Sequence, residues 1–213
     1  MGKVTGLLAD VSGKIGGYVV KKQPDGTSNI SQLQRPSSKP FTKKQLAVQQ
    51  RTLICSTMLA TIDSFIRIGF ALDAAKSKMN YYNAAAVNLR KNALSGEYPE
   101  ISLDYSKLLV TKGKLNSPED PTVTLDEFGI IFSWSTEQRT REDHFSDQVM
   151  MLAYFPEINK ARYTISGAER RKGKDMLVLS GIEQGYTAEL FISFIANDHR
   201  AISNSVYLGQ MIW

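Results

Sequence analysis

The chain has 213 residues, of which 42% are hydrophobic and 22% are charged, and its formal net charge is +5. These values are typical of a globular protein with a substantial core, in one large domain or two small ones, and they exclude a disordered chain. A single cysteine, Cys55, excludes an internal disulfide, and its helical apolar surroundings predict a buried thiol rather than a nucleophile.

Targeting and metal signals are weak. The N-terminal residues lack the apolar run of a signal peptide, and Gly6 stands where a myristoylation signal needs Ser or Thr. No stretch reaches the roughly 18 apolar residues of a membrane-spanning helix, so we expect cytoplasmic synthesis and no membrane partner. His144 and His199 have no Cys or His neighbour at ligand spacing, so neither a zinc site nor a cofactor is expected.

Residues 1–50 are the most basic part of the chain. They contain eight basic residues against two acidic ones, so this segment has a charge of +6 while the remaining 163 residues sum to −1. An arm of this sign is suited to a negatively charged partner. The predicted partner-binding residues of the arm are Lys14, Tyr18, Lys21, Lys22, Arg35, Lys39, Lys43 and Lys44.

Three interpretations of the arm stay open. Its cations suit an acidic protein surface, or the phosphates of a nucleic acid with Tyr18 stacked on a base, or they form a solvated arm. The segment Gly13-Lys14-Ile15-Gly16-Gly17 has neither the spacing nor the following helix of a Walker motif, so nucleotide binding is not expected.

Glycine and proline shape residues 1–40. Five glycines make the first part irregular, and Pro24-Asp25-Gly26-Thr27 separates two β-capable runs. This pattern predicts a β-hairpin over residues 16–34. Two prolines and two serines then predict an extended segment over residues 35–40.

Two helices follow. Thr42 and Gln45 match a capping box, and apolar residues at spacings of three and four from Leu46 through Leu53 to Phe70 predict one amphipathic helix ending near Leu72. A second run, over residues 75–94, ends before Gly96, which is a typical stop signal. We expect an antiparallel helical hairpin over residues 41–96, then a connecting strand and linker over residues 97–120.

From residue 121 onward the pattern predicts short strands separated by polar turns. Seven such strands are typical of an antiparallel β-sandwich, with Trp134 as an anchor between its sheets. The expected class is therefore α+β. The predicted strands are Val123–Leu125, Ile130–Trp134, Gln148–Phe155, Ala161–Ser166, Met176–Ser180, Thr187–Ala196 and Ser203–Gly209.

Two charged segments interrupt these strands. Residues 169–175 are predicted to form a charged hairpin tip, and residues 137–144 a mixed-charge loop. Side chains adjacent on a loop do not converge, and no nucleophile motif is present, so catalysis is not expected. Trp213 is expected to pack either on its own domain or on a neighbouring subunit.

The segment 121–213 resembles a fibronectin type III-like or immunoglobulin-like module, with an early tryptophan and a long penultimate strand. Nearly the whole chain also resembles an uncharacterised Bacteroidota family of unknown function. That resemblance implies an association with prophage or virion genes and implies no activity. The segments with this resemblance are Gln34-Arg35-Pro36, Lys39-Pro40-Phe41-Thr42 with Gln45, Gly96-Glu97-Tyr98-Pro99, Asp104-Tyr105-Ser106-Lys107 and Ser203-Asn204-Ser205-Val206-Tyr207-Leu208-Gly209.

The sequence thus predicts a non-catalytic structural or interaction protein. Its basic arm would join an assembly of its own subunits or of another protein, such as a phage virion or another multi-subunit particle. The alternative is a nucleic-acid-binding protein that uses the same arm.

Overall fold

The computed structural model describes residues 2–4, 12–23, 26–34, 39–137 and 144–213. The chain divides into two compact units, Met1–Thr42 and Lys43–Trp213. Helices and antiparallel sheets occur together, in agreement with the predicted α+β class.

The first unit is built on a four-stranded antiparallel sheet with the strand order β1-β4-β3-β2. Its inner strands form the predicted hairpin. The glycines predicted an irregular start to the chain, and this prediction is wrong in part because β1 and β2 extend the hairpin on both sides. Gly16 supplies the positive φ of +57° in the β2–β3 turn. Residues 35–38 of the predicted extended segment lie outside the described residues. The strands are β1 (Gly2–Val4), β2 (Gly13–Ile15), β3 (Tyr18–Lys22) and β4 (Ser28–Gln32).

The second unit begins with four helices where two were predicted. The single helix expected to end near Leu72 is three helices, and the axes of the first two differ by 89°. The periodicity continues across the break because the successive short helices all turn apolar side chains to one core, among them Leu59, Phe65 and Phe70. The helices are α1 (Lys43–Thr61), α2 (Asp63–Gly69), α3 (Ala71–Ser77) and α4 (Tyr81–Asn92).

Gly69 sets the end of α2. A Cβ at this position would lie 2.5 Å from the carbonyl oxygen of Val110, so only glycine allows the segment 110–112 to pass so close. The amide of Lys112 donates to the Gly69 carbonyl over 2.9 Å. The close backbone contact therefore favours a helix end inside an otherwise continuous apolar pattern.

The predicted second helix, 75–94, is also divided. α3 ends at Ser77, its C-cap residue Lys78 adopts the left-handed conformation, and α4 begins after Asn80. Gly96 does not terminate a helix; with φ of +85° it lies in the turn between the short strands β5 (Leu94–Ser95) and β6 (Ser102–Leu103). A 3-10 turn, η1 (Tyr105–Lys107), follows.

Asn80 caps α4, and its removal gives a first prediction. The Asn80 side chain accepts a hydrogen bond from the backbone N–H of Tyr82 over 3.0 Å. Asn80→Ala leaves this N–H without its acceptor and is expected to lower the free energy of unfolding by about 1 kcal/mol. Asn92→Ala, at the exposed last position of the same helix, is the control and should change stability by less than about 0.5 kcal/mol. Equal effects of the two changes in chemical denaturation would contradict the capping role.

The β-rich part of the second unit consists of two antiparallel sheets. Strands β10-β9-β12-β13 form one sheet in that order, and strands β11-β8-β7 form the other. All seven predicted strands are present, and Gln148–Phe155 has the predicted bounds. The strands are β7 (Thr122–Leu125), β8 (Gly129–Ser133), β9 (Gln148–Phe155), β10 (Lys160–Thr164), β11 (Lys174–Val178), β12 (Thr187–Ile195) and β13 (Val206–Ile212), with 3-10 turns η2 (Pro156–Ile158) and η3 (Arg170–Lys172).

One hydrophobic core lies between the two sheets. Leu190 and Phe194 of β12 contribute to it, together with Phe132 of β8 and Leu177 of β11. Trp134 is 5% exposed and packs in this core, as expected of a buried aromatic residue. Trp213 also packs here, and its indole N–H donates to the carbonyl of Ile182, so the C-terminus belongs to its own unit.

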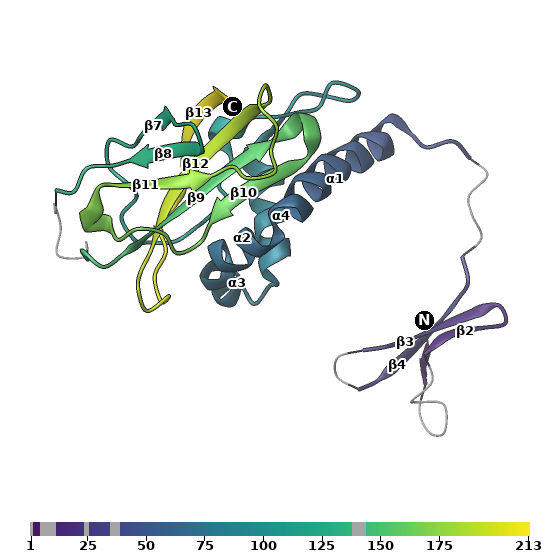
Figure 1. Ribbon diagram of the computed structural model, residues 1–213. Coiled ribbons are helices and arrows are strands. Elements are labelled where there is room, and N and C mark those ends of the chain that lie inside the picture. The colour runs from purple at the N-terminus through teal and green to yellow at the C-terminus, as the bar shows by residue number, and fades with distance from the viewer. Residues whose placement is uncertain (1, 5–11, 24–25, 35–38, 138–143) are drawn as a thin grey trace. The chain divides into compact units, whose positions relative to one another are not determined.

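A second core lies on the other face of the four-stranded sheet, where the helices pack (Figure 1). Leu152 of β9 and Phe191 of β12 meet Leu59 and Phe65 of the helices there, and Cys55 is buried in this core as predicted. Strands β9 and β12 are therefore buried on both faces. The second unit thus has three layers: helices, the four-stranded sheet and the three-stranded sheet.

None of the described helices by itself is long and apolar enough to cross a bilayer, while α1 and α2, separated by the 89° bend, reach the required length and composition together.

Candidate functional site

The sheet of the first unit separates its side chains into two faces. In an antiparallel sheet, residues directly opposite each other share a face, and successive residues of a strand alternate between faces. Lys14 is opposite Val19, and Val19 is opposite Ser31, so these three side chains share one face. Lys21, opposite Asn29, lies on the same side. We call this side, with Lys14, Val19, Lys21, Asn29 and Ser31, the basic face.

The opposite side is more apolar. Ile15 is opposite Tyr18, and Val20 is opposite Ile30, which places these four side chains together. Val20 is buried, whereas Ile15 and Tyr18 are 48% and 53% exposed. We call this side the apolar face; Lys22 belongs to it by alternation along β3.

The predicted partner-binding residues are therefore only partly brought together. Lys14 and Lys21 are diagonal neighbours on the basic face, a relation that corresponds to roughly 7–8 Å between backbone positions. Tyr18 and Lys22 lie on the apolar face instead. The Tyr18 ring therefore does not lie beside Lys14 and Lys21 on one surface.

The other predicted cations do not extend this sheet. Arg35 lies outside the described residues, and Lys39 is exposed beyond β4. Lys43 and Lys44 are exposed in the first turn of α1 and belong to the second unit. Among the described residues, no ion pair engages Lys14 or Lys21, so their charges are available to an anionic partner.

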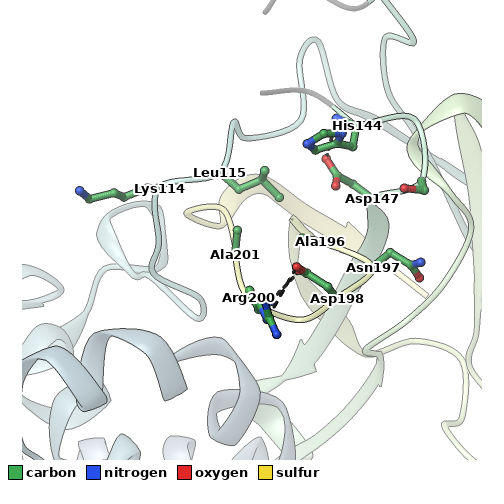
Figure 2. A pocket seen from close by; sticks show the side chains of 10 residues that line it. Lys114, Leu115, His144, Asp147, Ala196, Asn197, Asp198, Arg200 and Ala201 are labelled. Carbon is green, nitrogen blue, oxygen red and sulfur yellow. Dashed lines mark hydrogen bonds and ion pairs between the residues drawn. The ribbon is translucent and has the colours of Figure 1, made fainter. Parts of the chain in front are cut away.

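A cavity of about 650 Å³ lies at one end of the β-rich part (Figure 2). Lys114, His144 and Asn197 line it, as do Asp198 and Arg200, whose charged groups are 4.0 Å apart. Most of these side chains are exposed, and in the part of the chain that the structure describes no hydrogen bond joins the His144 imidazole to a nucleophile. Residues 138–143 of the predicted mixed-charge loop lie outside the described residues. The described geometry of this cavity does not assemble a catalytic group.

Beside this cavity lies a buried ion pair. Two nitrogens of the Arg170 guanidinium lie 3.2 Å from Asp147 Oδ2, and the two side chains are 9% and 1% exposed. Arg170 also donates to the carbonyl of Asn116, and its guanidinium lies 3.9 Å from the centroid of the Phe194 ring. The Trp134 indole N–H in turn donates to the Arg170 carbonyl. Arg170 therefore joins η3 to the core between the sheets.

The position of this pair corrects the prediction of a hairpin tip over residues 169–175 and accounts for a shifted pKa at Asp147. Residues 169–175 are not a hairpin tip, because the strands before and after them, β10 and β11, belong to different sheets. Arg170, within this segment, is also buried. Asp147 Oδ1 is buried and has no hydrogen-bond partner in the described structure. Burial raises the pKa of Asp147, and the Arg170 guanidinium opposes this rise without cancelling it. The pair is held inside the fold, where losing one partner would leave the other charge buried and unpaired, and its carboxylate is not exposed for chemistry.

A second buried carboxylate lies on the helix-facing side of the four-stranded sheet. Glu189 is 2% exposed, and its two oxygens accept hydrogen bonds from the Tyr207 hydroxyl over 2.6 Å and from the Gln210 amide over 2.8 Å. Burial is the main cause that raises the pKa of Tyr207, and the hydrogen bond to Glu189 raises it further. Both groups are satisfied within the sheet. Sequence reasoning missed this trio, although Glu189 in the middle of an apolar strand was a visible signal.

Metal binding finds no support in the described geometry. Within the described ranges, no group of three or more His, Cys, Asp or Glu side chains comes together to hold an ion. The candidate site is the sheet of the first unit, with its basic face and its partly exposed apolar face.

Comparison with known proteins agrees with the predicted resemblance at the level of the family. Residues 10–209 match a Family of unknown function (DUF6266). No curated protein and no solved structure matches the chain. The family match covers nearly the whole sequence and brings no activity, ligand or partner with it. The chain belongs to this family of unknown function.

Proposed function

We propose that this protein is a non-catalytic structural or interaction protein that joins an assembly through the sheet of its first unit. The observation behind this proposal is the two-sided character of that sheet, with Lys14 and Lys21 on the basic face and Ile15 and Tyr18 exposed on the apolar face. Protein interfaces usually combine an apolar core with a polar rim.

The outer strands of the same sheet support a protein partner. β1 and β2 are the two ends of the strand order, and each pairs on one side within the described sheet. An outer strand offers backbone N–H and C=O groups to a further strand from another chain. The setting we propose, a phage virion or another multi-subunit particle of a Bacteroidota prophage, follows from the resemblance of the sequence alone.

The alternative is nucleic-acid binding by the basic face. The two lysines without ion pairs, Lys14 and Lys21, favour it because phosphates need such cations. Tyr18 argues against it, since its ring lies on the other face and cannot stack on a base held at the two lysines. We therefore rank protein assembly first.

We also propose that the seven strands form a fibronectin type III-like sandwich that acts as the scaffold of the second unit. In constant-type immunoglobulin domains the fourth strand pairs with the fifth, whereas here the fourth strand, β10, pairs with the third, β9. This difference favours the fibronectin-like alternative. Such a module has no function of its own, because function lies in the sites attached to it.

The test compares masses in solution. Light scattering of the full chain should give an oligomer, and a chain starting at Lys43 should give the monomer mass. Removal of residues 1–42 is expected to leave the fold of the second unit intact, because the members of both hydrophobic cores all follow residue 43. If the shortened chain keeps the oligomer mass, the proposal fails.

A charge-reversed variant separates the two candidate functions. Lys14→Glu/Lys21→Glu is compared with Lys76→Glu/Lys91→Glu, which changes the net charge equally on exposed positions of the second unit. If the protein binds single-stranded DNA, the first variant should lose binding, and affinity should fall steeply with salt. Assembly through the sheet instead predicts a lower oligomer mass for the first variant and no DNA affinity for any form.

A further inference from the structure

The negative charge of the chain is as concentrated as its positive charge. Residues 115–138 contain five acidic residues and no Lys or Arg, a charge of −5, whereas residues 51–114 sum to +4 and residues 139–213 to zero. The basic segment 1–50, at +6, therefore has one strongly acidic counterpart in the same sequence. The acidic residues of this counterpart are Glu119, Asp120, Asp126, Glu127 and Glu137.

The fold displays this segment on the hairpin of β7 and β8. Asp120 precedes β7, and Asp126 and Glu127 lie in the turn between the strands. Asp120 and Glu127 are exposed, and in the described ranges no salt bridge engages either of them or Asp126. The hairpin thus presents negative charge that the described part of its own unit does not neutralise.

Exposed apolar side chains surround the same hairpin. Leu125 and Phe128 at its turn are 53% and 63% exposed. On the outer face of the three-stranded sheet, Met176 and Val178 are 37% and 49% exposed, in contrast to the four-stranded sheet, whose outer face the helices cover. β7 is an end strand of its sheet, so one side of its backbone is open to a further strand.

We propose that the β7–β8 hairpin is the docking surface for the first-unit sheet of a second copy of this chain. This inference rests on the proposed function and names its partner. The complementarity is twofold: the lysines of the basic face against the carboxylates of the hairpin, and one outer strand against another.

The geometry of such a contact determines the kind of assembly. The sheet and the hairpin are different surfaces, so the contact is heterologous, and a bound pair of copies keeps one free sheet and one free hairpin. Repetition of a heterologous contact closes into a ring or extends into a filament, whereas an isologous contact stops at a dimer. We therefore expect masses beyond the dimer at high protein concentration.

The experiment is a charge exchange measured by sedimentation or light scattering across a concentration series. Asp120→Lys/Glu127→Lys should weaken self-association at least about tenfold, as should Lys14→Glu/Lys21→Glu, because each places like charges at the contact. Combining all four changes in one chain restores opposite charges and should recover most of the affinity. Asp126 is left unchanged because its carboxylate accepts a hydrogen bond from the Phe128 amide.

Glu97→Lys/Glu100→Lys is the matched control, since it reverses two exposed acids in another turn of the same unit and should leave association within about twofold. Thermal unfolding confirms that each variant is folded. If the lysine variant dissociates but the hairpin variant does not, the proposed function stands and the docking surface is wrong. If the four-fold variant stays dissociated, the pairing is also wrong. A full chain that is monomeric at every concentration overturns both proposals.

Discussion

Arg170→Met is expected to lower the free energy of unfolding by about 3–5 kcal/mol at pH 7, because it leaves a buried carboxylate without its cation. Asp147 is 1% exposed, so water cannot replace the lost partner. Methionine approximates the length of arginine but removes the hydrogen bonds to Asp147 and Asn116 and the guanidinium contact with Phe194. Chemical denaturation of the variant and the parent protein measures the loss.

The loss is expected to shrink as the pH falls. The pKa of Asp147 is already raised by burial, and removal of Arg170 raises it further. At a pH between the lower pKa of Asp147 in the unfolded chain and its raised pKa in the folded variant, the folded variant binds a proton that the unfolded chain releases. The stability contributed by such a raised carboxyl is complete below the unfolded pKa and disappears as the pH rises through the folded pKa. The variant should therefore lie closer to the parent protein at about pH 5 than at about pH 7.

Two further variants control this prediction. Arg171→Met changes the neighbouring arginine, whose partner Glu169 is 33% exposed, and should cost less than about 1 kcal/mol. Arg170→Met/Asp147→Asn removes the buried charge as well, so it should recover a large part of the loss at pH 7 and flatten the pH dependence. A double variant as unstable as Arg170→Met would show that packing against Phe194, and not the unpaired carboxylate, accounts for the effect.

Phe191→Ala is the second change with a large expected effect, a loss of about 3–5 kcal/mol. Phe191 is fully buried on the helix-facing side of β12, where its ring lies 5.3 Å from that of Tyr207. The alanine variant leaves a cavity between the four-stranded sheet and the helices, and the well-packed layers on both sides prevent its collapse.

Leu53→Ala is the matched control for Phe191→Ala. Leu53 belongs to the apolar pattern that predicted the first long helix, yet it is 65% exposed on α1. Its truncation should change the free energy of unfolding by less than about 0.5 kcal/mol. Similar losses for the two variants in urea denaturation would mean that the outward side of α1 is covered in the native protein.

The predictability of the fold differs between its parts for physical reasons. Strands buried on both faces are nearly continuous apolar runs bounded by polar residues, so the sequence gives the bounds of Gln148–Phe155 directly. The breaks after Thr61 and after Gly69 were not predictable in this way. The apolar spacing continues through both breaks, and the second depends on the close approach of Gly69 to a segment some 40 residues away. Strands β1 and β2 were missed because glycine lowers strand propensity, while pairing with the hairpin supplies the missing stability.

The candidate site was predictable in composition and not in arrangement. Counting charges identified the basic arm, and alternation along β3 already separates Tyr18 from Lys21. The face on which Lys14 lies depends on the register of β2 against β3, and the three residues of β2 do not specify that register. Arg170 was assigned to a charged tip because it lies in a charged cluster between two predicted strands, whereas its burial depends on Asp147, 23 residues earlier in the chain.

Strands β9 and β12 supply side chains to both hydrophobic cores at once. Neither the helices nor the three-stranded sheet can therefore detach without exposing one side of the same two strands, which makes the second unit a single cooperative folding unit. The amides at the centre of β9 and β12 are consequently the ones that exchange with deuterated solvent through global opening alone, so they report the stability of the whole unit.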